Sequence, residues 1–159
     1  MNSFMREQYP MFEMYQALRS QLLEILTDQD LDFAPGGENL TLGALCREMG
    51  ETERSYIDSL KSFKQDFSYR NQEPGLDKSV GKLSIWYEEL DQELKSTLES
   101  FSDEDLQNRI VDRGAGFELP LWIQMEVYKE ALIIFYGKVS VYLKAVGKPR
   151  PPQWQDWIG

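Results

Sequence analysis

The chain has 159 residues, of which 27 are acidic and 17 are basic, so its net charge is −10. This negative charge repels the phosphate backbone of nucleic acids and the anionic face of membranes, and we expect neither as a partner. One cysteine and no histidine exclude an internal disulfide, His-ligated metals and imidazole-dependent catalysis. The 13% aromatic content indicates a folded core, and the length fits one domain over residues 1–159.

No segment of the sequence has the pattern of a membrane span. The longest unbroken apolar run, Ala131 to Tyr136, is far shorter than the ~20 residues that cross a bilayer. The first residues, MNSFMREQYPMFEMYQ, contain no apolar signal core. These features predict an acidic, cytoplasmic protein without membrane contact.

Four segments carry apolar residues at the three- and four-residue spacing of an amphipathic helix. They span residues 10–25, 41–63, 83–98 and 120–146. Thr41 is a plausible N-cap, the third segment follows the breaker EPGLDKS, and Pro120 suits a first helical turn. Gly147 and a proline-rich stop end the fourth segment, which is the most apolar, so we place it most centrally.

A short repeat divides the chain into two halves. Thr27 after the first helix and Ser102 after the third are each followed by acidic residues, which is typical of a capped helical turn. Each turn leads through a glycine-containing loop into the next long helix. Two helix–turn–helix halves predict an all-α, antiparallel four-helix bundle. We expect Trp154 and Trp157 of the tail to pack over one end of this bundle.

The segments ENLTLGALCREMGETERSYIDSL, FSDEDLQNRI and EALIIFYGKVSVYLKAVGKPRPP, in this order and spacing, resemble the DinB/YfiT-like family of four-helix bundles. That family includes metal-dependent, thiol-linked transferases. The resemblance implies one metal-binding histidine in the second helix and two in the last, at positions that fall on Glu48, Ala131 and Phe135. A methyl group and a phenyl ring donate no lone pair, and one carboxylate does not hold a transition metal. We therefore expect no metal, no cofactor and no catalytic residue at this site.

Other acidic side chains do not offer an obvious replacement site. Glu126 and Glu130 are spaced at i and i+4, but they flank a different side of the last helix, and the histidine half of a bundle di-iron motif is absent. Acidic side chains on helices more often face solvent than form a metal-binding site. We interpret Cys46 as a small buried hydrophobe, because no histidine is present to lower the pKa of its thiol.

A candidate pocket remains where the family binds metal. It comprises Glu48, Thr52, Gln124, Tyr128, Ala131 and Phe135. We favour closure of this cavity by the ring of Phe135, because protein interiors seldom leave voids. The alternative is an open apolar pocket with Glu48 at its wall. If Glu48 is buried, it needs a partner such as Tyr128, Gln124 or a neighbouring arginine, and otherwise it should reach solvent.

These features lead to two functional hypotheses. The favoured one is a DinB-like bundle that binds a small apolar ligand or a protein partner without catalysis, and a homodimer through the outer surface of the bundle is one form of it. The alternative is a metal-independent, thiol-linked transferase that uses Glu48 as acid/base and Tyr128 as a positioning donor. The second hypothesis still needs a group that lowers the pKa of the thiol, and the sequence offers none.

Overall fold

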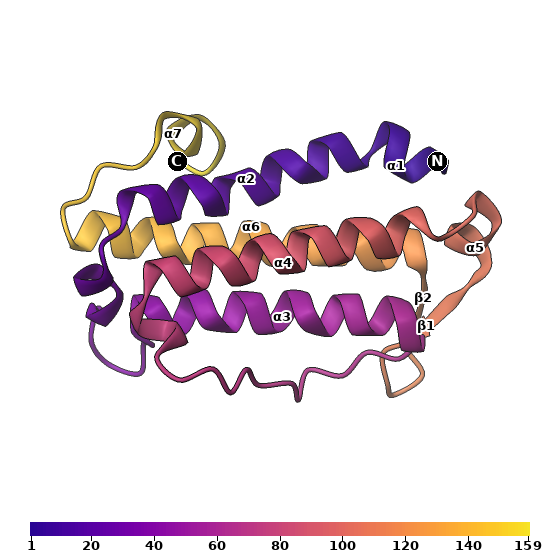
Figure 1. The fold of residues 1–159 in the computed structure, drawn as a ribbon, viewed down its shortest axis with the longest axis horizontal. Helices are drawn as coiled ribbons and strands as arrows, with labels where there is room; N and C mark the ends of the chain where they lie inside the picture. Colours follow the sequence, from indigo (N-terminus) through magenta and orange to yellow (C-terminus); the bar gives the residue numbers. More distant parts are fainter.

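A computed structural model describes all residues 1–159. Four long helices build it, α2 (Tyr9–Ile25), α3 (Leu42–Ser62), α4 (Val80–Glu99) and α6 (Leu121–Ala145). They lie side by side along the long axis of the molecule, and α2 and α3 each contact both α4 and α6 (Figure 1). The predicted all-α four-helix bundle is therefore confirmed. No helix is both long and apolar enough to cross a membrane.

Short elements connect and cover the long helices. They are α1 (Ser3–Glu7), the 3₁₀ helices η1 (Asp28–Asp32) and η2 (Leu76–Lys78), α5 (Asp103–Asn108), strands β1 (Ile110–Asp112) and β2 (Glu118–Pro120), and α7 (Pro152–Trp157). The two strands form an antiparallel hairpin, with Val111 opposite Leu119. Sequence analysis missed this hairpin because three-residue strands are too short to show alternation.

The predicted helix start at Thr41 agrees with the cap in the structure, whereas Pro120 is the N-cap of α6 and the last residue of β2, one position before the helix begins. The hydroxyl of Thr41 accepts a hydrogen bond from the backbone N–H of Ala44 at 3.1 Å, at the start of α3. Both predicted capped turns are full capping boxes, in which Thr27 and Ser102 exchange hydrogen bonds with the third residue that follows. The repeat therefore marks a real structural equivalence between the two halves.

The connection 63–79 sets the relative direction of the two halves. It runs back along α3, so that α4 begins beside the start of α3 (Figure 1). Consecutive helices within each half are antiparallel, whereas the neighbours α3 and α4 are parallel. At Gly50 of α3, an added Cβ would overlap the ring of Trp86 on α4. Glycine therefore permits the close approach of these two parallel helices.

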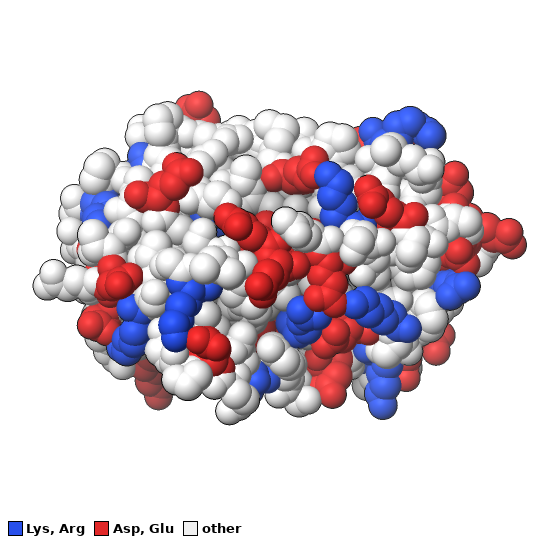
Figure 2. All heavy atoms as spheres, viewed as in Figure 1, with Lys and Arg blue, Asp and Glu red and all other residues white.

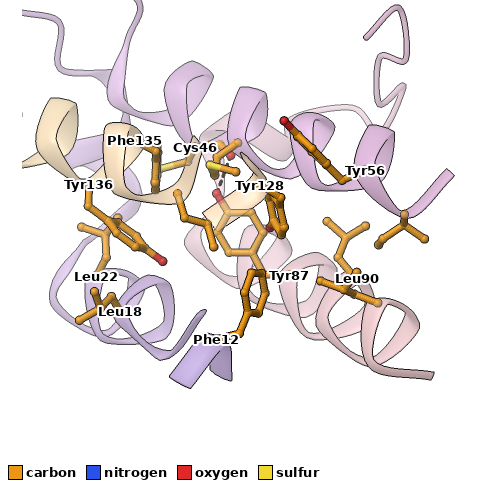
Figure 3. Close-up of a cluster of buried hydrophobic side chains, with 14 of the residues drawn as sticks. Phe12, Leu18, Leu22, Cys46, Tyr56, Tyr87, Leu90, Tyr128, Phe135 and Tyr136 are labelled. Carbon is orange, nitrogen blue, oxygen red and sulfur yellow. Dashed lines mark hydrogen bonds between the residues drawn. The ribbon is translucent and has the colours of Figure 1, made fainter. Parts of the chain in front are cut away.

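The apolar stripes of the four helices meet in one core. Phe12 and Leu18 of α2, Tyr56 of α3 and Tyr136 of α6 are among its buried side chains (Figure 3). Cys46 is fully buried in the same core, and burial raises the pKa of its thiol to about 12. The interpretation of this cysteine as a buried hydrophobe therefore agrees with its position.

The tail folds back against the bundle through α7. Trp154 is fully buried, and its indole N–H donates to the carbonyl of Leu18 at 3.0 Å. Trp157 packs edge-on against Tyr15 at 5.3 Å between ring centroids, yet it remains 37% exposed. Trp154 is thus enclosed, whereas Trp157 is only partly covered.

An ion cluster lies inside the bundle. The guanidinium of Arg19 on α2 pairs with the carboxylates of Glu53 on α3 and Asp91 on α4, and it lies over the ring of Tyr87. Arg19 and Glu53 are at most 1% exposed. The amide of Gln16 donates to both carboxylates. Three helices are thereby joined through one buried charge.

Burial sets the charge state of this cluster. It raises the pKa of Asp91 to about 7, an effect that Arg19 opposes and Glu53 reinforces. Burial also lowers the pKa of Arg19, but Glu53 and Asp91 more than compensate, so that this pKa stays well above its usual value. The cluster therefore takes up a proton near neutral pH while Arg19 remains charged.

This titration predicts that the protein is more stable at mildly acidic than at alkaline pH. The folded-state pKa of Asp91 lies above its ordinary value of 3.8, so its contribution to the free energy of unfolding is full below about pH 4. That contribution is lost as the pH rises through about 7. Urea denaturation followed by circular dichroism should show this decline, and Asp91→Asn should flatten it. An unchanged pH dependence in Asp91→Asn, matching that of the exposed control Asp156→Asn, would contradict the assignment.

Candidate functional site

A groove of about 170 Å³ lies between α3 and α6. The residues that line it are Leu45, Glu48, Met49, Thr52, Ala131, Ile134, Phe135 and Lys138. Four of the six predicted pocket residues are among them. The three positions that the family resemblance assigns to metal ligands, on two different helices, therefore meet at one place.

Phe135 lines this groove and is almost completely buried. Its side chain is only 4% exposed, and it packs against Tyr136 with ring centroids 5.5 Å apart (Figure 3). Ile134 is 60% exposed at the rim. The ring of Phe135 thus lies in the interior, and the space beside it is a small groove on the surface.

The rim of the groove carries two opposite charges. The side chains of Glu48 on α3 and Lys138 on α6 are both exposed. Glu48 thus reaches solvent, which is one of the two outcomes expected for it. The hydroxyl of Thr52 donates to the backbone carbonyl of Glu48 at 2.9 Å, so it is already engaged within α3. An amphipathic surface results, with an apolar floor and a charged edge.

Two predicted pocket residues lie elsewhere. Gln124 is two helical turns before Ala131, and its amide donates to Ser59 at 2.8 Å and to Gln65 at 2.6 Å. This position is roughly 10 Å along the helix axis from the groove. Gln124 therefore joins the start of α6 to the end of α3, and it does not line the groove.

Tyr128 is the other residue that does not reach the groove. Its ring packs between Phe12 at 5.4 Å and Tyr56 at 4.9 Å, measured between centroids, and it is fully buried (Figure 3). Burial raises the pKa of its hydroxyl well above the usual value, and the hydroxyl has no hydrogen-bond partner. Tyr128 can therefore not act as a positioning donor for a ligand in this groove.

The residues of the groove do not fit a transition metal. Glu48 offers the only carboxylate, and the lining includes no histidine or cysteine. Nowhere in the chain do three aspartate, glutamate or cysteine side chains converge as metal ligands. A catalytic metal typically needs three protein ligands, so the donor set here is incomplete.

A second hollow of about 490 Å³ adjoins the groove and shares Glu48 and Thr52 with it. Phe67 and Arg70 of the connection 63–79 line it opposite α3. Glu51, which is nearly buried, accepts hydrogen bonds from Arg47 at 3.1 Å and from the backbone of Asn71 at 3.0 Å. The bond from Asn71 attaches the connection to α3, whereas the bond from Arg47 lies within that helix. Sequence analysis missed this hollow because it assigned no position to the connection.

Comparison with known proteins supports the fold. No protein-family model matches the chain. A DinB-like protein (YjoA) from Bacillus subtilis is 14% identical and superposes over 87% of this chain and 90% of its own with a TM-score of 0.68. A DinB-like protein from Bacillus cereus ATCC 10987 is 19% identical over 90% of this chain and 93% of its own, with a TM-score of 0.74. The chain therefore has a DinB-like fold.

A match to one curated protein covers only a short part of both chains. "Putative acid phosphatase 1" of Caenorhabditis briggsae is 40% identical over 52 residues, which are 33% of this chain. The match spans only 12% of the length of that protein. It therefore describes a segment rather than a whole domain.

The packing of Phe135 predicts a large effect of its removal on stability. Phe135→Ala deletes a buried ring and leaves a cavity, so it should lower the free energy of unfolding by ~3–5 kcal/mol. Ile134→Ala on the exposed rim is the matched control and should change it by less than ~1 kcal/mol. Chemical denaturation of both variants measures the difference. Equal, small losses would show that the ring is not part of the core.

Proposed function

We propose that this DinB-like chain is a non-catalytic binding protein whose groove between α3 and α6 receives a small apolar group. The observation that carries the proposal is the lining of the groove, which combines five hydrophobic side chains with a single carboxylate. This lining supports contact with an apolar surface and offers no set of metal ligands. The proposal includes the loss of the metal site that the family resemblance implies at Glu48, Ala131 and Phe135.

The size of the groove supports a modest occupant. Ligand pockets for drug-sized molecules measure about 300–1,000 Å³. The groove, at about 170 Å³, is smaller, so it suits a single ring, a short alkyl chain or one side chain of a partner protein. Glu48 and Lys138 at the rim would pair with a charged group on that occupant. The proposed ligand is therefore small and amphipathic.

Catalysis is the less well supported alternative. A metal-independent, thiol-linked transferase would use Glu48 as its acid/base, and this carboxylate is exposed and accessible. However, Tyr128 is buried away from the groove, and the pKa of the Cys46 thiol is about 12. The match to "Putative acid phosphatase 1" covers only 52 residues and does not support a phosphatase function for this chain.

We also propose that the protein is cytoplasmic, in keeping with its single free cysteine.

The binding proposal predicts specific contacts for two simple probes. Benzylamine and benzoate each combine a ring with one charge, and their charges suit Glu48 and Lys138 respectively. Titration followed by ¹H–¹⁵N NMR should shift the amide signals of Thr52 and Lys138, with saturation at concentrations on the order of 1–10 mM. Ala131→Trp should abolish these shifts because the indole fills the groove. Ala17→Trp, at an exposed site on α2, should leave them intact.

The same experiment separates the proposal from the alternative. Shifts that persist in Ala131→Trp, or that are absent from the native chain, would contradict binding in the groove. Thiol transfer can be assayed with glutathione and an aromatic electrophile. We expect no rate above the uncatalysed reaction, and Glu48→Gln should be silent. A rate that Glu48→Gln removes would favour the transferase instead.

A further inference from the structure

The outward face of α6 is apolar where it meets solvent. Ile133, Ile134 and Val141 are 40%, 60% and 59% exposed, and all three lie within four residues of Gly137. They are three of the twelve large hydrophobic side chains that are exposed in the whole chain. Scattered single hydrophobics are normal at a protein surface, but a cluster on one helix face marks a contact site.

Gly137 lies at the centre of this face. An added Cβ there would meet no atom within 4 Å, so the packing of this chain does not require glycine. Glycine within a helix lowers stability by about 1 kcal/mol relative to alanine. Its missing side chain leaves the backbone of α6 open to close approach from outside.

The charges on this face are arranged symmetrically about Gly137. Glu130 lies seven residues before it and Lys144 seven residues after it, and both are exposed. At 3.6 residues per turn, both lie within ~20° of Gly137 around the helix and about 10 Å from it along the axis. Neither forms an ion pair within the chain. Ile133 and Val141 lie symmetrically as well, four residues on either side.

We propose that a second copy of this chain docks on this face, with the two α6 helices crossing antiparallel about a two-fold axis at Gly137. In that arrangement Glu130 of each copy faces Lys144 of the other, and Ile133 faces Val141. The Glu130–Lys144 ion pair therefore forms twice, as two-fold symmetry requires. A parallel arrangement would instead bring like charges together, at Glu130 and at Lys144.

The distribution of charge over the molecule favours this face over the others. Two chains of net charge −10 repel each other. The face around α4 carries many acidic side chains, interspersed with basic ones (Figure 2). Residues 131–155, in contrast, contain no aspartate or glutamate. Contact through α6 therefore brings together the region of the chain with the least negative charge.

The dimer would also border the binding groove. Ile134 and Lys138 line the groove and lie next to Gly137 on the outward side of α6. The second copy would thus narrow the entrance beside these two residues. Dimerisation does not depend on the proposed ligand, so the two proposals can fail separately.

A charge-swap experiment tests the dimer. Sedimentation equilibrium of the native chain should give twice the 18.6 kDa mass of one chain at concentrations between about 1 µM and 1 mM. Glu130→Lys or Lys144→Glu alone should raise the dissociation constant at least about tenfold, because both symmetric pairs become repulsive. The double variant should return it to within about threefold of the native value.

The control variant is Glu88→Lys, which makes the same charge change at an exposed site on α4. It should leave the dimer intact, and circular dichroism should show that all variants stay helical. A native chain that is monomeric throughout the range would overturn the proposal. A dimer that tolerates both single swaps, or that the double variant fails to restore, would overturn the antiparallel crossing at Gly137.

Discussion

The buried guanidinium of Arg19 needs two carboxylates from two other helices, and this requirement constrains the rest of the bundle. A buried charge without partners is strongly destabilising, so α2, α3 and α4 must bring Arg19, Glu53 and Asp91 to one point. The pairing of Glu53 with Arg19 therefore fixes the rotation of α3 about its own axis. Glu48 precedes Glu53 by five residues, or about 140° around the helix, and therefore faces the surface beside α6. The ion cluster in the core and the charged rim of the groove thus follow from a single orientation of α3.

The sequence predicts the helices well because their signals are local. The caps at Thr41, Thr27 and Ser102 use short-range hydrogen bonds, and the apolar stripes repeat within one element. The ion cluster was not predictable in this way. Its members are far apart in the sequence. In addition, the sequence around the charged residues at positions 19 and 53 does not differ from the sequence around a charged residue that faces solvent. The parallel relation of α3 and α4 was missed for a similar reason, since it depends on the path of the connection 63–79.

The candidate site was predicted in part. Glu48, Thr52, Ala131 and Phe135 meet at the groove because the i, i+4 spacing on α6 and the register with α3 place them together. Gln124 shares their side of α6 but lies two turns away, where it bonds to Ser59. Tyr128 is turned about 60° from Ala131, which is enough to direct its ring into the core. Helical spacing predicts the side of the helix to which a side chain points, but it does not predict which residues of other helices that side chain contacts. The result is a small amphipathic groove beside an apolar helix face, and the proposed binding and dimerisation use these two surfaces.

We propose that this DinB-like fold holds a binding groove at the place where its family resemblance implies a metal. The metal content of the untagged protein after dialysis against zinc or nickel tests this proposal. The native chain should retain no stoichiometric metal. A variant that combines Glu48→His, Ala131→His and Phe135→His should bind about one ion per chain, because these positions meet in the groove. One equivalent of metal bound by side chains of the native protein would show that the metal site has not been lost.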